Sequence, residues 1–363
     1  MAARVEKQLT RNFQSLQVLR GVACLLVVFF HASELYQQKL GGLFFGNIFF
    51  FGSAGVDVFF TLSGFIIAFT SFSSLGKPAN IIPFAIKRFI RIYPIYWIVI
   101  TALLVMQLLA PAFYRSGYSP DITSLFSTYL LLPAHQMVNG VSWTLTNELF
   151  FYLVFSLAFL LPFPKLLIAI ITGYMLLLPF VPAAYQQDGN STLLSLVFFP
   201  MNIEFFLGVL VATFFHHLPA RYARLVITTG IAWFIGGAVL YDLGIQVAEG
   251  TFNRVILFGF PSALVITGLV KLESLEPVHA GAVFRNPGDA SYTLYLVHLP
   301  LLAAGAILLA FTGAGPVMLH LMMLVLVLVI TLLSIVIYRM VEKPMITNLN
   351  RLLIKPKVIL NGK

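Results

Sequence analysis

The stretch LRGVACLLVVFFHASE, residues 19–34, combines an apolar run of membrane-spanning length with three ionisable side chains. Arg20 opens the run, and His31 and Glu34 close it. An ionisable group is costly in hydrocarbon unless it faces a partner or a water-filled cavity. The stretch therefore predicts a membrane helix whose polar side chains belong to a site.

The composition extends this prediction to the whole chain. Of 363 residues, 60% are hydrophobic and 10% are charged, with a mean hydropathy of +0.95, whereas roughly a quarter of the residues of a soluble domain are charged. Apolar runs of about 20 residues are long enough to cross the membrane as helices. We place such spans at 16–35, 47–70, 90–111, 143–161, 165–182, 193–215, 225–241, 253–270, 290–312 and 317–339. The predicted fold class is an all-α, polytopic integral membrane protein with about ten transmembrane helices.

The distribution of Lys and Arg predicts the orientation, because cytoplasmic loops carry an excess of these residues. With the N-terminus inside, 19 of the 22 basic residues fall on the cytoplasmic side, and Lys39, Arg115 and Arg254 fall outside. The cytoplasmic set is Arg4, Lys7, Arg11, Arg20, Lys77, Lys87, Arg88, Arg91, Lys165, Arg221, Arg224, Lys271, Arg285, Arg339, Lys343, Arg351, Lys355, Lys357 and Lys363. We therefore predict that both termini are cytoplasmic.

The chain is predicted to form a single membrane domain over residues 1–345, followed by a short basic cytoplasmic tail over 346–363. The orientation and an attraction to anionic membrane lipid explain the net charge of +9, so we predict no nucleic-acid partner. Cys24 is the only cysteine, which excludes an internal disulfide. No His-x-x-x-His or Glu-x-x-His spacing occurs in a predicted span, so we predict no metal.

The ionisable residues of the first span share one face of the helix. Arg20 and His31 are 11 residues apart, which separates them by about 20° around the helix and about 16 Å along it. Glu34 lies one turn beyond His31 on nearly the same face. The first helix is thus predicted to carry a polar stripe with a cation at one end and an imidazole and a carboxylate towards the other.

Further polar groups occur in the motif AIKRFIRIYPIYW, residues 85–97. Arg88 and Arg91 are spaced i, i+3 and share a helix face. Two interpretations stay open: the pair binds an anionic ligand, or it anchors the helix at the cytoplasmic surface by extending its charged ends to the interface.

Two carboxylates also lie inside apolar spans, Asp57 in AGVDVFFTLSGF and Glu148 in VSWTLTNELFFY. Both are predicted to lie in the outer half of the membrane, at the depth of His31 and Glu34. Buried hydrogen-bonded pairs that hold helices together would explain them, but several acids and an imidazole at one depth favour a cavity. His298, in GDASYTLYLVHLPLL, is either a packing residue or part of the same cavity.

The motifs that carry these residues resemble those of a known family. In chain order they are LQVLRGVACLLVVFFH, GVDVFFTLSGFIIA, KRFIRIYPIYW, SWTLTNELFFY and SYTLYLVHLPL. The sequence resembles the acyltransferase-3 family of integral-membrane acyltransferases, and most of all its exopolysaccharide O-acetyltransferase branch. The resemblance implies that His31 is the catalytic histidine, and that Arg20 and the Arg-x-x-Arg pair Arg88 and Arg91 bind acyl-coenzyme A.

The resemblance also implies a substrate class and a location. We expect a membrane O-acyltransferase, in the cytoplasmic membrane of a bacterium, that transfers an acyl group, expected to be acetyl, from acyl-CoA to a hydroxyl of a lipid-linked or exported polysaccharide. Acyl-CoA is the expected co-substrate, with no permanently bound cofactor, and polysaccharide-assembly proteins are further expected partners. We expect no appended extracytoplasmic hydrolase-like domain, so the acceptor site is sought among Ser63, Trp143, Glu148 and His298.

The expected mechanism uses His31 as a general base on the acceptor hydroxyl, with Glu34 or Asp57 orienting its ring. Direct transfer is the favoured route, and an acetyl-imidazole intermediate is the open alternative. Intramembrane charges also mark substrate pathways, so a transporter or flippase is the alternative from another class. A non-enzymatic polysaccharide-assembly subunit is a third interpretation, but it leaves the polar stripe unexplained.

Overall fold

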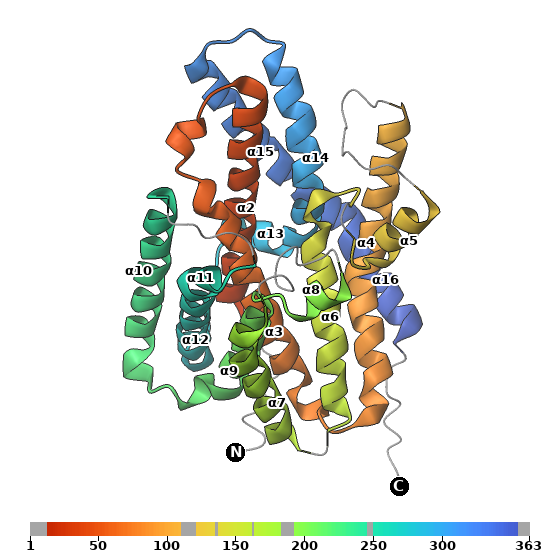
Figure 1. Cartoon of the computed structure of the whole chain (residues 1–363), viewed down its shortest axis with the longest axis vertical. Coiled ribbons are helices and arrows are strands. Elements are labelled where there is room, and N and C mark those ends of the chain that lie inside the picture. Colours follow the sequence, from red (N-terminus) through yellow and green to blue (C-terminus); the bar gives the residue numbers. More distant parts are fainter. Residues whose placement is uncertain are drawn as a thin grey trace.

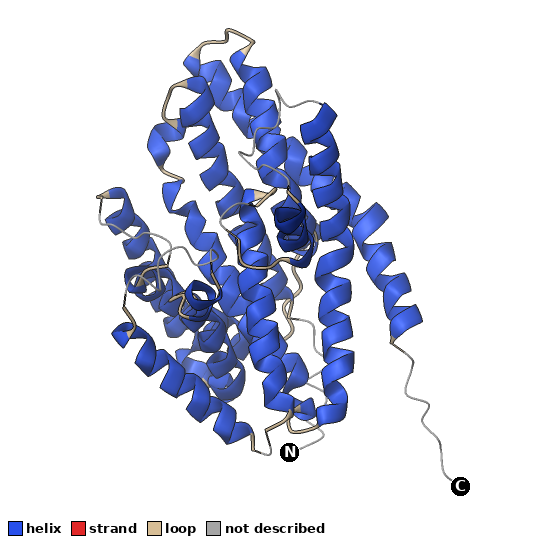
Figure 2. Cartoon of the chain, turned by 45° about the vertical axis from the view of Figure 1, so that its right-hand side comes forward, coloured by secondary structure: helices blue, strands red, loops and turns tan. Residues whose placement is uncertain are grey.

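The computed structural model describes residues 13–109, 121–134, 137–161, 163–182, 192–244 and 250–354. Within these ranges the regular structure is helical and no strand is found (Figure 2). Nine helical segments of the described chain are long and apolar enough to cross a membrane. They are Gln14–Leu40, Phe50–Ser74, Pro78–Leu109, Gly140–Phe159, Leu193–His217, Ala220–Asp242, Phe252–Leu275, Ser291–Ala310 and Pro316–Leu353. The predicted all-α polytopic fold is thereby confirmed.

The helices follow one another in short succession along the chain (Figure 1). The longer ones are α2 (Gln14–Leu40), α3 (Gly55–Ser71), α4 (Ile81–Leu109), α6 (Trp143–Ser156), α7 (Pro164–Leu177), α9 (Asn202–Phe214), α10 (Ala223–Asp242), α12 (Phe260–Leu275), α14 (Ser291–Ala310), α15 (Pro316–Ile337) and α16 (Lys343–Leu353). The shorter ones are α5 (Ile122–Leu130), α8 (Leu193–Val197), α11 (Phe252–Arg254) and α13 (Ala282–Asp289). Two π-helical turns, η11 (Val255–Gly259) and η12 (Tyr338–Glu342), interrupt the α-helical geometry.

The fifth predicted span, 165–182, differs from the others. Its apolar helix covers Leu166–Phe180, about 22 Å at 1.5 Å per residue, which is less than the roughly 30 Å of a hydrocarbon core. Helix α7 begins with Pro164, and Pro179 falls in the 3₁₀ turn that follows it. Because proline lacks the amide hydrogen that a helix interior needs, these two residues limit the α-helical length.

The orientation of the termini stays a prediction. Several of the basic residues on which it rests lie outside the described residues, namely Arg4, Lys7, Arg11, Arg115, Lys355, Lys357 and Lys363.

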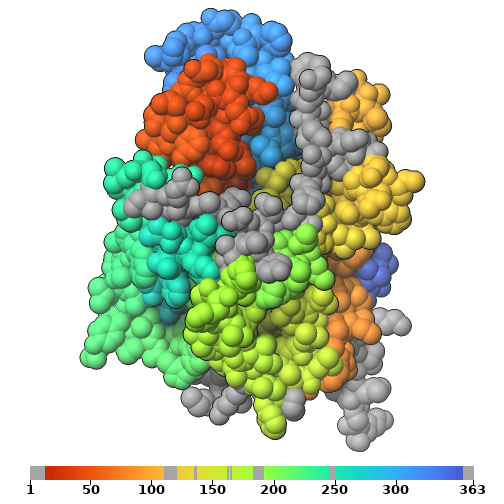
Figure 3. Space-filling view, viewed as in Figure 1, coloured from red at the N-terminus to blue at the C-terminus, as the bar shows by residue number. Residues whose placement is uncertain are grey.

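Helix α2 lies at the centre of the packing. It contacts α3, α13, α14 and the 3₁₀ turn η2 (Phe50–Ala54), with α15 also beside it. The C-terminal part of α2 projects together with the tips of α14 and α15 at one end of the molecule (Figure 3). Helices α4, α6 and α16 lie to the right of α2 and α3 in Figure 1. Helices α3 and α14, which carry two of the other sequence motifs, thus pack directly against the helix that carries the polar stripe.

Helices α3 and α9 approach each other closely at two glycines. A Cβ atom on Gly64 would lie 1.9 Å from the carbonyl oxygen of Phe205, and one on Gly208 would lie 2.1 Å from that of Thr61. Small residues allow this contact between membrane helices, where close van der Waals packing drives association. The crossing fixes the position of α3, which carries Asp57 and Ser63.

Part of the predicted tail, residues 346–353, is helical. The boundary predicted at residue 346 falls inside α16, which follows α15 through η12 and packs against α4. Met345 packs against the main hydrophobic core. The described part of the tail is therefore a continuation of the helical domain, and residues 355–363 lie outside the described residues.

Candidate active site

A large cavity of 1290 Å³ opens between α2, α3, α4, α6, α14 and α16. Its lining runs from the α3–α4 connection, at the lower end of Figure 1, to Val56 and Tyr295 in the interior. Most small-molecule pockets have about 300–1,000 Å³. The large cavity therefore has room for an extended ligand the size of a nucleotide cofactor.

Basic side chains from three helices line this cavity. They are Arg20 of α2, Lys87, Arg88 and Arg91 of α4, and Arg351 of α16. Glu148 is the only carboxylate among its lining residues. The structure thus brings together Arg20, Arg88 and Arg91, as the sequence motifs predicted, and adds two cations that the motifs did not single out. The excess of positive charge suits an anionic ligand.

Arg91 is held in place by a carboxylate that the sequence did not reveal. Its Nη1 donates to Oε1 of Glu342 at 3.0 Å, and the other Glu342 oxygen accepts a hydrogen bond from the Thr293 hydroxyl at 2.5 Å. The guanidinium also lies 5.4 Å from the centre of the Tyr292 ring. The sequence feature that could have indicated this contact is Glu342 itself, an acid just after the last apolar span, where a carboxylate is costly unless it has a partner.

Arg88 has a different environment. Its guanidinium lies 5.3 Å from the ring centre of Phe84 and 5.5 Å from that of Tyr152. Its Nε is buried and has no hydrogen-bond partner among the described residues. A buried donor without an acceptor is unfavourable, so Arg88 is placed to receive an acceptor from a ligand.

Glu148 belongs with the arginines and not with His31, which corrects the predicted grouping. Its Oε1 accepts a hydrogen bond from the Ser63 hydroxyl at 2.8 Å and another from the Tyr152 hydroxyl. Ser63, Tyr152 and Glu148 all line the large cavity. The spacing of residues within one helix does not reveal the contact between Ser63 and Glu148, because it depends on how α3 and α6 tilt and cross.

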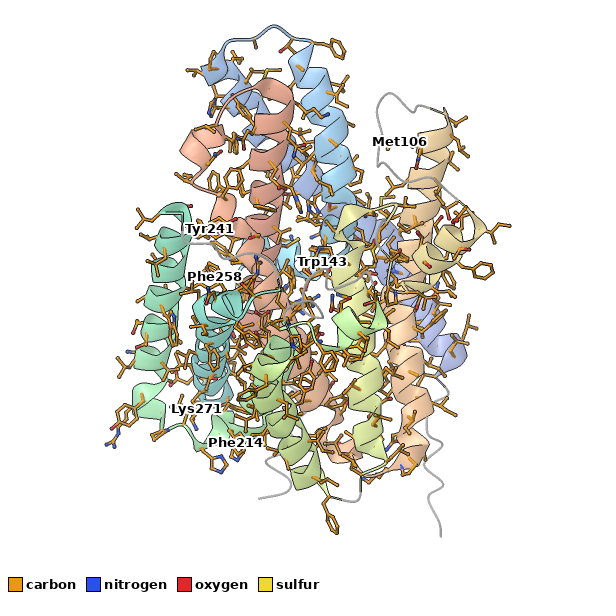
Figure 4. The ribbon with its side chains drawn as sticks, in the orientation of Figure 1. Met106, Trp143, Phe214, Tyr241, Phe258 and Lys271 are labelled. Atoms are coloured by element: carbon orange, nitrogen blue, oxygen red, sulfur yellow. The ribbon has the colours of Figure 1, made fainter. Side chains whose placement is uncertain are left out.

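A second, small cavity contains His31, and we call it the histidine pocket. Its volume is 40 Å³, enough for a water-sized group, which needs about 10–15 Å³. It is lined by Val27, Phe30, His31, Ser53, Val56, Gly140, Val141, Trp143 and Tyr295. Val56 and Tyr295 also line the large cavity, so the two spaces adjoin at these side chains. Trp143, at the start of α6, lies near the middle of the molecule (Figure 4).

The imidazole of His31 is oriented by Glu34. His31 Nδ1 lies 2.9 Å from Glu34 Oε2, one turn further along α2. An ionised carboxylate only accepts hydrogen bonds, so Nδ1 carries the hydrogen and Nε2 keeps its basic lone pair. Arg20 lines the large cavity and His31 lines the histidine pocket. The polar stripe therefore joins both spaces along one continuous helix.

A second imidazole lies beside the first. His298 of α14 is fully buried, and the centres of the His31 and His298 rings are 5.2 Å apart. His298 Nδ1 lies 3.1 Å from the carbonyl oxygen of Leu294 and must donate to it, while its Nε2 is buried without a partner among the described residues. His298 therefore presents an unused hydrogen-bond acceptor next to the ring of His31.

Tyr295 is a further site residue that sequence analysis did not identify, although it lies in the motif that contains His298. Thr144 Oγ1 of α6 donates to the Tyr295 hydroxyl at 2.9 Å. The amide of Asn139, just before α6, donates to the Leu296 carbonyl at 2.8 Å. These contacts fix α6 to α14 where the large cavity meets the histidine pocket.

Asp57 pairs with Arg254 in the structure, and the predicted contact in which it would orient His31 is not found among the described residues. Its carboxylate receives hydrogen bonds from Arg254 Nε at 3.1 and 3.2 Å and from Nη2 at 2.8 Å, and both side chains are buried. Arg254 Nη2 also donates to the Ser53 carbonyl at 2.7 Å, and Glu204 of α9 lies beside Asp57. Arg254 was predicted on the outer side, at the start of the span 253–270, and the sequence did not reveal that it is buried against Asp57.

The geometry can be compared with known proteins. The Acyl_transf_3 family, described as an acyltransferase domain, matches residues 13–339. The chain belongs to this acyltransferase-3 family. The match covers the polar stripe, the Arg-x-x-Arg pair and His298, and it makes the protein an integral-membrane acyltransferase.

Three individual relatives share 27–28% of their residues with this acyltransferase. The exopolysaccharide production protein ExoZ of Rhizobium meliloti (strain 1021) is 28% identical over 83% of this chain and 92% of its own length. Acyltransferase MdmB of Streptomyces mycarofaciens is 28% identical over 80% of this chain and 79% of its own. Nodulation protein 10 of Rhizobium leguminosarum bv. viciae is 27% identical over 78% of this chain and 81% of its own. No solved structure gives a significant match.

Proposed function

We propose that this acyltransferase transfers an acyl group, acetyl by preference, from cytoplasmic acyl-CoA to a sugar hydroxyl of a lipid-linked or exported polysaccharide. The observation that carries the proposal is the junction at Val56 and Tyr295 of a cation-lined cavity with the pocket of His31. The family membership supports acyl transfer over transport. The name of the relative ExoZ supports a polysaccharide acceptor, and the bacterial relatives support a cytoplasmic membrane location.

The donor would enter from the side on which the large cavity is lined by basic residues. Guanidinium groups bind phosphate through charge-assisted, bidentate hydrogen bonds, and Arg88 has a buried donor without a partner. Arg20 and His31 are about 16 Å apart along α2. The flexible arm of coenzyme A would follow this polar stripe and carry the thioester past Tyr295 to His31. This proposal requires the cavity mouth, and with it both termini, to be cytoplasmic.

At His31 the reaction is a general-base transfer. Nε2 of His31 takes the proton from the acceptor hydroxyl while the hydroxyl oxygen attacks the thioester carbonyl. The carbon–sulfur bond then breaks, and the departing sulfur takes the proton back from the imidazolium. The Glu34 carboxylate stabilises the imidazolium and fixes the ring. In the alternative route, Nε2 attacks the thioester first and passes the acyl group to the hydroxyl.

The two acceptor-site candidates near His31 have distinct parts in this proposal. Trp143 lines the histidine pocket, which at 40 Å³ admits the reacting hydroxyl but not the whole sugar, so the indole would contact the edge of the ring that carries this hydroxyl. His298 Nε2 would accept a hydrogen bond from a second, non-reacting hydroxyl of the acceptor sugar, since it has no partner among the described residues. Ser63 and Glu148 line the large cavity, so we assign them to the donor arm and not to the acceptor.

The test is a transfer assay with purified protein in proteoliposomes. Radiolabelled acetyl-CoA and a panel of lipid-linked sugars are supplied, and the labelled product is extracted and analysed. We expect label on the sugar with wild-type protein and a large loss with His31→Gln. In a parallel experiment with the label on the lipid-linked sugar, movement of the intact sugar between leaflets, without acetylation of any acceptor in the panel, would instead support the transporter.

A further inference from the structure

The cations of the large cavity fall into two groups that differ in their acidic neighbours. The inner group is Arg20 and Arg91. Arg91 forms an ion pair with Glu342, and Arg20 lies within electrostatic reach of Glu148 and Glu342. The outer group is Lys87 and Arg351, which form no ion pair with any residue in the described part of the chain. The fifth cation, Arg88, also forms no ion pair in the described structure, but its guanidinium packs against the rings of Phe84 and Tyr152. The unpaired charge that is exposed in the cavity is therefore that of the outer group.

Helix α16 supplies the wall that carries Arg351. Ile346, Asn350 and Ile354 line the large cavity at i, i+4 spacing, with Arg351 next to them. Leu352 faces away and is 75% exposed. Because α16 packs along α4, the helix that carries Lys87 forms the adjoining wall. Lys87 and Arg351 thus lie on neighbouring helices, α4 and α16, that line the same cavity (Figure 1).

The wall of the cavity that α16 forms lies beyond the family match, whereas the α4 wall lies within it. The family match ends at residue 339, whereas α16 covers Lys343–Leu353. Arg351 and Asn350 therefore have no role that the family membership assigns. Their position in the cavity wall is a property of this chain's own C-terminal segment.

The charge pattern of the donor decides how it would lie. In coenzyme A the phosphates, a diphosphate and a 3′-phosphate, are all at the nucleotide end, while the arm and the thioester are uncharged. If the thioester reaches His31, the phosphates lie towards the other end of the large cavity. Cations with no acidic partner bind phosphate without first breaking an ion pair.

We propose that Lys87 and Arg351 form a subsite for the phosphates of the donor's nucleotide end, with Asn350 as a neighbouring hydrogen-bonding group. This proposal rests on the proposed function, because it requires an acyl-CoA donor. It makes α16 a specificity element: the enzyme distinguishes coenzyme A from shorter pantetheine thioesters through Lys87 and through Arg351, which lies beyond the family match.

The experiment measures binding, so that it does not depend on the identity of the acceptor. Isothermal titration of the purified full-length protein uses three probes: coenzyme A, dephospho-coenzyme A, which lacks the 3′-phosphate, and pantetheine. The variants are Arg351→Ala, Lys87→Ala and, as a matched control, Arg339→Ala, an exposed arginine that does not line the cavity. Apparent melting temperatures show that each variant is folded.

We expect Arg351→Ala and Lys87→Ala each to weaken coenzyme A binding by about tenfold, typical of a lost charge-assisted contact. Pantetheine binding should be unchanged in both, and Arg339→Ala should bind all three probes as the wild type does. Unchanged coenzyme A affinity in Arg351→Ala and Lys87→Ala, or an equal loss for pantetheine, would overturn the subsite while leaving the proposed function intact. Failure of the wild type to bind coenzyme A would instead overturn the donor assignment and the subsite with it.

Discussion

Replacing Asp57 by Asn tests whether this carboxylate holds the fold together or serves His31. The substitution removes the negative charge that faces Arg254 at 2.8–3.2 Å in a fully buried site. Removing one partner of a buried pair costs about 3–5 kcal/mol, because the other charge is left uncompensated. Glu204 lies next to Asp57 and can take up part of the contact with Arg254, so we expect a loss near the lower end, about 3 kcal/mol.

The assay compares stability with turnover in the same preparation. At about 2 °C per kcal/mol for a chain of this size, Asp57→Asn should lower the apparent melting temperature by about 6 °C, while kcat of the folded protein stays within about threefold of the wild type. Replacing both partners avoids the unpaired charge, so the double variant Asp57→Asn with Arg254→Gln should recover most of the stability.

Glu34→Gln is the matched control, because it neutralises the carboxylate that does contact His31. The Glu34 side chain is 34% exposed, so the melting temperature of the Glu34→Gln protein should differ little from that of the wild type. Its kcat should fall by about 10–100-fold, since the carboxylate contributes at most about 4 kcal/mol to the imidazolium at an intermediate dielectric, before solvent screening. An Asp57→Asn protein that melts like the wild type but loses a hundredfold in kcat would refute the structural role and return Asp57 to the catalytic group.

Three further predictions concern the donor, the orientation and the packing. Arg88→Ala or Arg91→Ala should raise KM for acyl-CoA by about 10–100-fold in steady-state assays with little change in kcat, and lysine should restore only part of it because it lacks the planar fork; an unchanged KM in both would reduce the pair to an anchor. Single cysteines in a cysteine-free background should be shielded from impermeant maleimide at Lys77 and labelled at Lys39 in intact cells, and the reverse pattern would invert the predicted topology. Gly64→Leu should abolish monodisperse purification, because its side chain would collide with the α9 backbone; normal gel filtration would contradict the close crossing.

The fold was predictable from sequence because its main determinant is local. Every predicted span has a helical counterpart, since a run of apolar residues must form a helix to satisfy its backbone in lipid. The helix in the predicted span 165–182 is shorter than the others, because Pro164 and Pro179 lie at its ends. Proline lacks the amide hydrogen that a helix interior needs, and the hydropathy of the segment does not reveal this. The helix α16, Lys343–Leu353, extends into the predicted tail and was missed because its polar residues give it no apolar run in the sequence.

The site was predictable only where its residues share one helix. Arg20, His31 and Glu34 follow from the helical period of α2, and the structure finds the His31–Glu34 contact that this period allows. The pairings of Asp57 with Arg254 and of Arg91 with Glu342 join residues far apart in the chain. Nothing in the spacing of one segment encodes them, because they depend on how the helices tilt and cross.

The central claim is that His31 is the general base, and the most direct measurement is the single-turnover rate of His31→Gln with saturating acetyl-CoA and acceptor. Glutamine keeps the size and hydrogen bonding of the side chain but has no basic nitrogen. We predict a rate lower by roughly 10²–10⁴-fold, with coenzyme A affinity and melting temperature near those of the wild type. A His31→Gln rate above about a tenth of the wild-type value would contradict a general base of this strength and would move the role to His298.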